Sequence, residues 1–103
     1  MLKVISLLKR KEDMSLAEFR RWAMEEHPPL GLKLKGIRRY YMSVVTEDSP
    51  DLPYHAVSEF WFDNKAAMEA AFAAPEGKAA AEDAIAHCSA RSRMLTEQKV
   101  ILE

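Results

Sequence analysis

The segment LKVISLLK (residues 2–9) alternates in a way that leaves apolar side chains on both faces of a predicted strand. The two sets are Leu2, Val4 and Leu8 on one face, and Ile5 and Leu7 on the other. A strand that is apolar on both faces is buried on both. Any sheet built around this segment therefore needs cover on each side.

Length and charge narrow the class of protein. A chain of 103 residues forms one domain, residues 1–103, and its net charge of −1 gives no field for capturing nucleic acid or a membrane surface. The single cysteine, Cys88, excludes an internal disulfide. Because the first predicted strand starts at residue 2, we expect no signal peptide, and no apolar run approaches the roughly 20 residues of a membrane span. We expect a cytoplasmic protein without nucleic-acid or membrane partners.

A helix is predicted to begin at Ser15 and to end at His27. Ser15 and Glu18 have the spacing of a capping box. Leu16, Phe19 and Ala23 form a core-facing stripe, and His27 lies about 20° from Leu16 on the helical wheel, so its ring emerges on the buried side. Pro28 and Pro29 disfavour helical geometry at His27 and turn the chain out of the helix.

The rest of the chain alternates between strand and helix signals. Strands are predicted over residues 37–45 (after the turn residue Gly36), 55–62 and 94–102, with a loop at 46–53. Asp63 or Asn64 caps an alanine-rich helix that stops at Ala74, and a second helix covers residues 78–87, its start weakened by Gly77.

The order βαββαβ is that of the α+β, ferredoxin-like fold, an antiparallel sheet with helices on one face. The helices cannot cover the other face, which measures nearly 400 Å² in projection for four six-residue strands. That area is around the largest apolar patch of an ordinary soluble monomer. We therefore expect a homodimer in which two sheets pack face to face and enclose a lined cavity; the alternative is a wet, sparsely apolar face.

The chain also resembles the EthD family along nearly its whole length. The matching segments are residues 1–11 (MLKVISLLKRK), 14–21 (MSLAEFRR), 26–30 (EHPPL), 36–40 (GIRRY), 59–63 (EFWFD), 74–79 (APEGKA) and the closing Thr96-Glu97. The resemblance implies a dimeric α/β barrel of the ferredoxin-like plan. The family takes its name from a protein encoded alongside a monooxygenase system that degrades ethyl tert-butyl ether. Similar folds serve isomerases and monooxygenases. Ala74 departs from an expected capping Ser, and residues 87–93 match no recognisable pattern.

Three side chains are candidates for catalysis. His27 can both give and take a proton near neutral pH, and it matches the family histidine; alternatively it closes a helix and meets the helix dipole. Tyr40 donates its hydroxyl to a substrate oxygen or packs in the sheet. Glu59 lies in an apolar strand and needs a partner, for which Arg38 or Arg39 is the candidate. It is either a functional carboxylate or half of a structural ion pair.

Trp61, His55 and Arg38 are candidates for substrate binding, although Trp61 is more often a core residue. His87 and Cys88 lie together without further ligands, so we expect no metal site. The chain has no GxGxxG, P-loop or CxxC, and we expect no cofactor.

These observations favour an enzyme or accessory protein of small-molecule degradation that acts on a compact, partly apolar compound. Cofactor-free oxidoreductase or monooxygenase chemistry, isomerisation and dehydration are all compatible with so few groups. One alternative is a non-catalytic ligand-binding module that serves a partner monooxygenase. Another is a heme-handling protein with His27 or His55 as the axial ligand.

Overall fold

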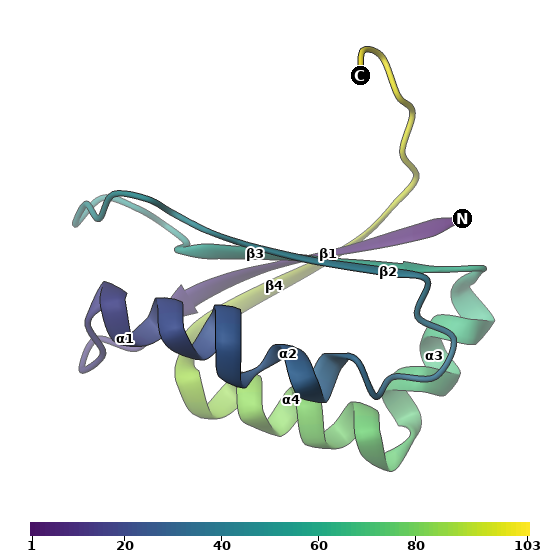
Figure 1. Ribbon diagram of the computed structural model, residues 1–103, viewed down its shortest axis with the longest axis horizontal. Helices are drawn as coiled ribbons and strands as arrows, with labels where there is room; N and C mark the ends of the chain where they lie inside the picture. Colours follow the sequence, from purple (N-terminus) through teal and green to yellow (C-terminus); the bar gives the residue numbers. More distant parts are fainter.

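A four-stranded antiparallel sheet, covered by helices on one face only, forms the structure (Figure 1). The computed structural model describes residues 1–103. The strands are β1 (Leu2–Arg10), β2 (Arg39–Val44), β3 (Ala56–Phe62) and β4 (Cys88–Thr96), in the sheet order β2-β3-β1-β4. The helices are α1 (Leu16–Arg21), the π-helical turn η1 (Trp22–Glu26), α2 (Pro28–Gly31), α3 (Lys65–Ala73) and α4 (Pro75–His87). The predicted α+β, ferredoxin-like fold is confirmed.

The first helical region begins as predicted and continues differently. Ser15 and Glu18 form both hydrogen bonds of the capping box. The chain then widens into η1, where the backbone N–H of His27 donates to the carbonyl of Trp22 at 2.8 Å. His27 itself is helical (φ −78°, ψ −40°), so the prediction that the prolines expel it from helical geometry is wrong. Proline is well accommodated in the first turn of a helix, and Pro28 starts α2.

The second helical region is longer than predicted. Asn64 caps α3 by accepting from the N–H of Ala67 at 2.9 Å. The helix α4 begins at Pro75 rather than at residue 78, with Pro75 in the first turn. The helix thus starts before Gly77, which lies within its first turn. A Cβ at Gly77 would lie 2.6 Å from the Cα of Phe72, so glycine is what allows α4 to approach α3 closely.

The last strand lies earlier in the chain than residues 94–102. The strand β4 spans Cys88–Thr96 and pairs with β1, with a register shift between Lys9 and Arg10. Its sequence is polar because it is an edge strand with most side chains exposed. Residues 97–103 leave the sheet and extend away from its uncovered face (Figure 1). The apolar run VIL at 100–102, which favoured the later strand, is exposed there.

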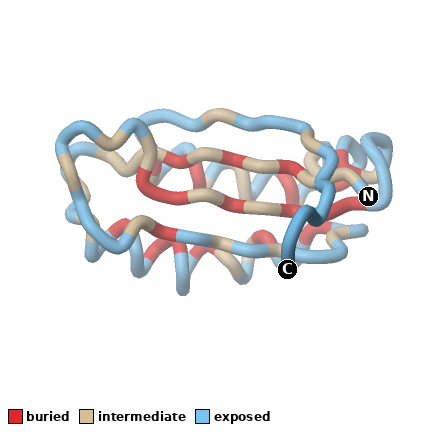
Figure 2. The backbone as a smooth tube through the Cα atoms, turned by 90° about the horizontal axis from the view of Figure 1, so that it is seen from above, coloured by how far each residue is buried: buried red, intermediate tan, exposed pale blue.

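The two faces of the sheet differ in burial. Along β1 the residues alternate between buried and half-buried (Figure 2), with Val4, Ser6 and Leu8 buried toward the helices. The opposite side, called here the open face, carries Ile5 and Leu7, which no helix covers (Figure 1). None of the helices has the length and apolar character needed to cross a membrane.

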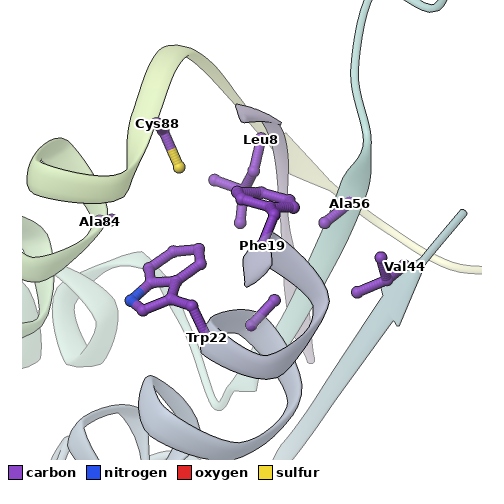
Figure 3. Packing of buried hydrophobic residues seen from close by; sticks show 8 residues of the cluster. Leu8, Phe19, Trp22, Val44, Ala56, Ala84 and Cys88 are labelled. Carbon is purple, nitrogen blue, oxygen red and sulfur yellow. The ribbon is translucent and has the colours of Figure 1, made fainter. Parts of the chain in front are cut away.

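The apolar interior between sheet and helices is divided into two clusters. The first, shown in Figure 3, consists of Leu8, Phe19, Trp22, Ala23, Val44, Ala56, Ala84 and Cys88. The second consists of Val4, Leu34, Phe60, Phe62, Met68 and Ala71. Both central strands contribute to each cluster. On the buried face of each strand, a single serine lies between the residues of the two clusters: Ser6 on β1 and Ser58 on β3.

Candidate functional site

A cavity of about 410 Å³ lies between the sheet and α4, where the two apolar clusters meet. It is lined by Ser6, Leu8, His27, Leu34, Ser58, Phe60, Phe72, Gly77, Ala80, Ala81, Ala84, Arg91, Ser92 and Arg93. Its volume falls in the range of small-molecule sites. The cavity belongs to one chain and to the helical side of the sheet, whereas we expected it between the sheets of two chains. The sequence did not predict this cavity, and a cavity between the sheets of two chains stays a prediction.

Small residues on opposite walls produce this hollow. Ser6 and Ser58 are direct partners across the β1–β3 pairing, and they are 7% and 4% exposed. Neither hydroxyl forms a hydrogen bond within the protein, and neither oxygen is fully enclosed, because the cavity reaches both. The facing wall of α4 presents Ala80, Ala81 and Ala84. The arrangement thus offers an apolar space with two unpartnered hydroxyls on its floor.

His27 enters this cavity with a fixed ring orientation. The imidazole is buried, and its Nδ1 lies 2.8 Å from Oδ2 of Asp83 on α4. The same oxygen accepts from Nε1–H of Trp22 at 2.9 Å. A carboxylate can only accept from the ring, so Nδ1 carries the proton. Nε2 has no protein partner and is the ring nitrogen available to a ligand.

The π-helical turn explains how Trp22 and His27 reach one carboxylate. In an α-helix, residues five apart point about 140° away from each other. The wider turn of η1 reduces that angle, and the rings of Trp22 and His27 lie 4.8 Å apart. On its other side Trp22 stacks on His87, also at 4.8 Å. His27 therefore sits on the buried side, as the helical wheel predicted, but by a different local geometry.

Two arginines from β4 complete the lining. Arg91 and Arg93 are two residues apart, so both point toward the helices, opposite Leu8 and Ser6 of β1. The guanidinium of Arg93 lies 4.2 Å from the ring centre of Phe72. Neither arginine forms an ion pair or hydrogen bond with the protein. No aspartate or glutamate lines the cavity, so its charged lining is wholly cationic.

Tyr40 lies on the same side of the sheet but outside the cavity lining. Its ring stacks on Phe60, with centres 4.6 Å apart, and fills the place where Gly31 has no Cβ. The hydroxyl is buried without a partner, and burial raises the pKa of Tyr40 to about 12. The structure places Tyr40 behind Phe60, as a support of the cavity wall rather than a group that faces a ligand.

Glu59 and Trp61 lie on the open face, away from the cavity. Glu59 forms an ion pair with Lys3, so the expectation that Arg38 or Arg39 holds it is wrong. The pairing places Glu59 opposite Ile5 and Tyr41. Arg39 lies over Trp61 instead, and Arg38 pairs with Asp63. Lys3 also lies 4.9 Å from the ring centre of Trp61.

Arg38 and His55 are also outside the cavity. Arg38 pairs with Asp63 at 2.9 Å on the surface, and this contact lowers the pKa of Asp63. His55 is buried at the end of β3, where its Nδ1 accepts from the N–H of Arg10 at 3.2 Å. Burial and the nearby Arg10 lower the pKa of His55. The two candidate heme ligands, His27 and His55, thus occupy separate places.

Sequence reasoning missed the cavity residues Ser6, Ser58, Arg91 and Arg93, and Asp83 behind His27. Two serines in otherwise apolar positions of the central strands were a signal for a hollow. The arginines lay in the segment that matched no pattern, and only the observed strand shows that they share a face. Asp83 gave no signal, because its contact with His27 joins two helices 56 residues apart. No three His, Cys, Asp or Glu side chains gather as a metal site would require.

Solved structures of similar fold cover nearly the whole chain. An ethyl tert-butyl ether D (EthD) family protein from Bacillus halodurans C-125 is 25% identical with a TM-score of 0.80, over 96% of this chain and 99% of that one. A dimeric ferredoxin-like protein of unknown function from Bacteroides fragilis is 21% identical with a TM-score of 0.71, over 94% and 95% of the two chains. SnoaB, a cofactor-independent oxygenase from Streptomyces nogalater, is 16% identical with a TM-score of 0.69, over 99% and 97%.

No protein of curated function matches the chain in sequence. The EthD domain, by contrast, matches residues 11–88. This span includes the capped helix, His27, Asp83 and the first residues of β2, β3 and β4. It covers more than half of the chain, which therefore belongs to the EthD family.

Proposed function

We propose that the protein is an enzyme that binds a compact, partly apolar molecule in the cavity and moves a proton to or from it through Nε2 of His27. The observation that carries the proposal is the contact of His27 Nδ1 with Asp83 beside a hollow floored by unpartnered serines. A carboxylate behind an imidazole fixes its tautomer and its orientation. The geometry supports general acid–base chemistry.

The elementary step is the removal of a proton next to a carbonyl or phenol. The C–H or O–H bond breaks, its electron pair remains on the ligand as an enolate or phenolate, and the proton passes to Nε2. Return of the proton to another carbon completes an isomerisation. Cofactor-free oxygenation of such an anion is the related possibility, and a cofactor-independent oxygenase shares the fold. A non-catalytic module would use the same cavity for binding alone.

Deuterium exchange into 2-tetralone tests the proposal, because this bicyclic ketone is compact and has acidic C–H bonds. We expect the wild-type protein to bind it and to accelerate exchange in D₂O above the buffer rate, as followed by proton NMR. His27→Gln should keep binding and lose the acceleration. His55→Gln is the control, since His55 is also a buried histidine but lies at the end of β3 outside the cavity.

The outcomes separate the two functions. Binding without accelerated exchange in the wild-type protein would favour the ligand-binding module. Binding that survives Ala81→Leu, which fills the cavity from α4, would place the ligand elsewhere and overturn the proposal. If His27→Gln lowers stability by up to about 1 kcal/mol, the loss of a helix-closing charge, and exchange is unaffected, His27 is only structural.

We further propose that the protein is a homodimer formed through the open face. That face carries Ile5, Leu7, Val57 and Trp61 beside the Lys3–Glu59 pair, and a similar structure is described as dimeric. Sedimentation should report twice the chain mass of 11.7 kDa. Val57→Arg should give monomers, whereas Ala79→Arg, on the exposed side of α4, should not. A stable wild-type monomer would contradict the dimer.

A further inference from the structure

Arg91 and Arg93 form a pair of cations at the cavity with no anion in the protein to match them. Both lie on the helical side of β4 and both line the cavity. Two other arginines in or next to the strands form ion pairs with a carboxylate. Arg10 pairs with Asp48, and Arg38 with Asp63, both at 2.9 Å. Asp83, which lies outside the cavity lining, is already bonded to Trp22 and His27.

The surroundings of Arg91 and Arg93 disfavour two neighbouring positive charges. Both side chains reach solvent, and the desolvation of the Arg93 guanidinium together with the charge of Arg91 lowers the pKa of Arg93. Two like charges beside an apolar space repel each other, and an anion between them would relieve that repulsion. The contact of the Arg93 guanidinium with the face of Phe72 at 4.2 Å holds the group over the apolar wall while its N–H donors remain free.

We propose that the ligand of the cavity is an organic anion, with a ring-shaped apolar body against Phe60 and Phe72 and a negatively charged oxygen bound by Arg91 and Arg93. The inference rests on the proposed function and names the ligand class of the same site. Guanidinium groups bind carboxylate and enolate oxygens through short, charge-assisted hydrogen bonds. The serine hydroxyls of the floor then serve the uncharged polar groups of the ligand.

The anion has two chemical sources that share this recognition. One is a carboxylate already present in the ligand. The other is the enolate that forms when His27 removes a proton, in which case the arginines stabilise charge as it develops. A carboxylate ligand requires the arginines for binding, whereas a neutral ketone requires them only for proton transfer.

Calorimetric binding of 2-naphthoate and 2-naphthamide tests the first source, because the two differ in charge and hardly in shape. We expect the wild-type protein to bind the carboxylate at least about tenfold more tightly, a difference of 1.4 kcal/mol. The preference should weaken with added salt. It should disappear in the double variant Arg91→Gln, Arg93→Gln and persist in Arg20→Gln, an exposed arginine of α1.

Arg93→Lys is a second variant, which keeps the positive charge but loses the planar set of donors. It tests the proposal even if the double variant fails to fold. It should retain part of the preference. For the second source, the double variant should still bind 2-tetralone but exchange its protons at least about tenfold more slowly. A slower exchange without carboxylate preference would assign the arginines to the developing enolate.

The inference is overturned if the amide binds as tightly as the carboxylate and the arginine variants exchange 2-tetralone at the wild-type rate. The proposed function survives that result, because ligands still occupy the cavity. It fails separately if neither naphthalene compound nor 2-tetralone binds, or if binding is insensitive to Ala81→Leu.

Discussion

Oδ2 of Asp83 lies 2.8 Å from Nδ1 of His27 and so joins α4 to the turn between η1 and α2. The contact is largely shielded from solvent, with the two side chains 24% and 7% exposed. The proton of the neutral imidazole is therefore held on Nδ1, the nitrogen that contacts Asp83. Nε2 is then the nitrogen without a proton, and under the proposed function it serves as the general base.

Asp83→Ala should destabilise the fold by about 1–3 kcal/mol, because it leaves the Nε1–H of Trp22 and the Nδ1–H of His27 without an acceptor. Urea denaturation measures the loss. Asp83→Asn keeps an acceptor oxygen and should lose less. Glu82→Ala, on the exposed side of the same helix, is the control. Equal losses at positions 82 and 83 would contradict the bridging role.

Tyr40→Phe should leave stability at neutral pH unchanged or raise it by about 1 kcal/mol, since the buried hydroxyl has no partner. Its pKa is raised to about 12 from 10.0, so the neutral phenol favours the folded state. This contribution is complete below pH 10 and is lost as the pH rises toward 12. Tyr40→Phe should therefore reduce the alkaline loss of stability.

Thermal melts between pH 9 and 12 measure this effect. Burial also raises the pKa of Cys88 to about 11, so the comparison belongs in a Cys88→Ala background. Tyr41→Phe, on the open face, is the matched control. A parallel alkaline decline in the Tyr40 and Tyr41 variants would show that Tyr40 is not the group responsible. Loss of 2-tetralone exchange in Tyr40→Phe would restore it to the site.

Glu59→Gln and Glu59→Leu should both leave 2-naphthoate binding intact, because Glu59 lies on the open face. In the dissociated chain the stability change should stay below about 1 kcal/mol, as for other partly exposed ion pairs. Lys3 keeps its hydrogen bond to Gln98 at 3.0 Å and its place over Trp61. Calorimetry and urea denaturation check the two statements. Loss of binding in either variant would return Glu59 to the candidate site.

Gly77→Ala should destabilise the protein although alanine is the better helix former by about 1 kcal/mol. The added Cβ meets the backbone of α3 and pushes the helices apart, at a cost of about 1–3 kcal/mol. Because Phe72 also lines the cavity, 2-naphthoate affinity should fall as well. Gly36→Ala is the control: it strains a left-handed residue (φ +82°) in open space and should spare binding. A stabilised Gly77→Ala would contradict the close helix packing.

The sequence was sufficient for the elements whose signals are local. The capping box at Ser15, the cap at Asn64 and the buried side of His27 depend on residues within a few positions of one another. The order of strands and helices followed from the same short-range patterns, and with it the fold. The strand β4 was misplaced because an exposed edge strand carries little apolar signal, while the free VIL run carries a strong one.

The site was less accessible because it depends on pairing between distant segments. Glu59 looked like a site carboxylate because the pattern of β3 does not state which of its faces the helices cover. The β1–β3 register decides it, placing Ser58 toward the helices and Glu59 toward Lys3. Asp83 and Arg93 likewise meet His27 and Ser6 through contacts that span most of the chain.

The interruption of both central strands by serine also bears on cooperativity. Val4 and Phe60 belong to one apolar cluster, and Leu8 and Ala56 to the other, with the hollow between them. Units of a fold that share few packed contacts open with separate free energies, which hydrogen exchange resolves. A ligand seated in the hollow supplies the missing contacts and couples the two halves. Ligand binding should therefore make the two clusters unfold together as a single unit.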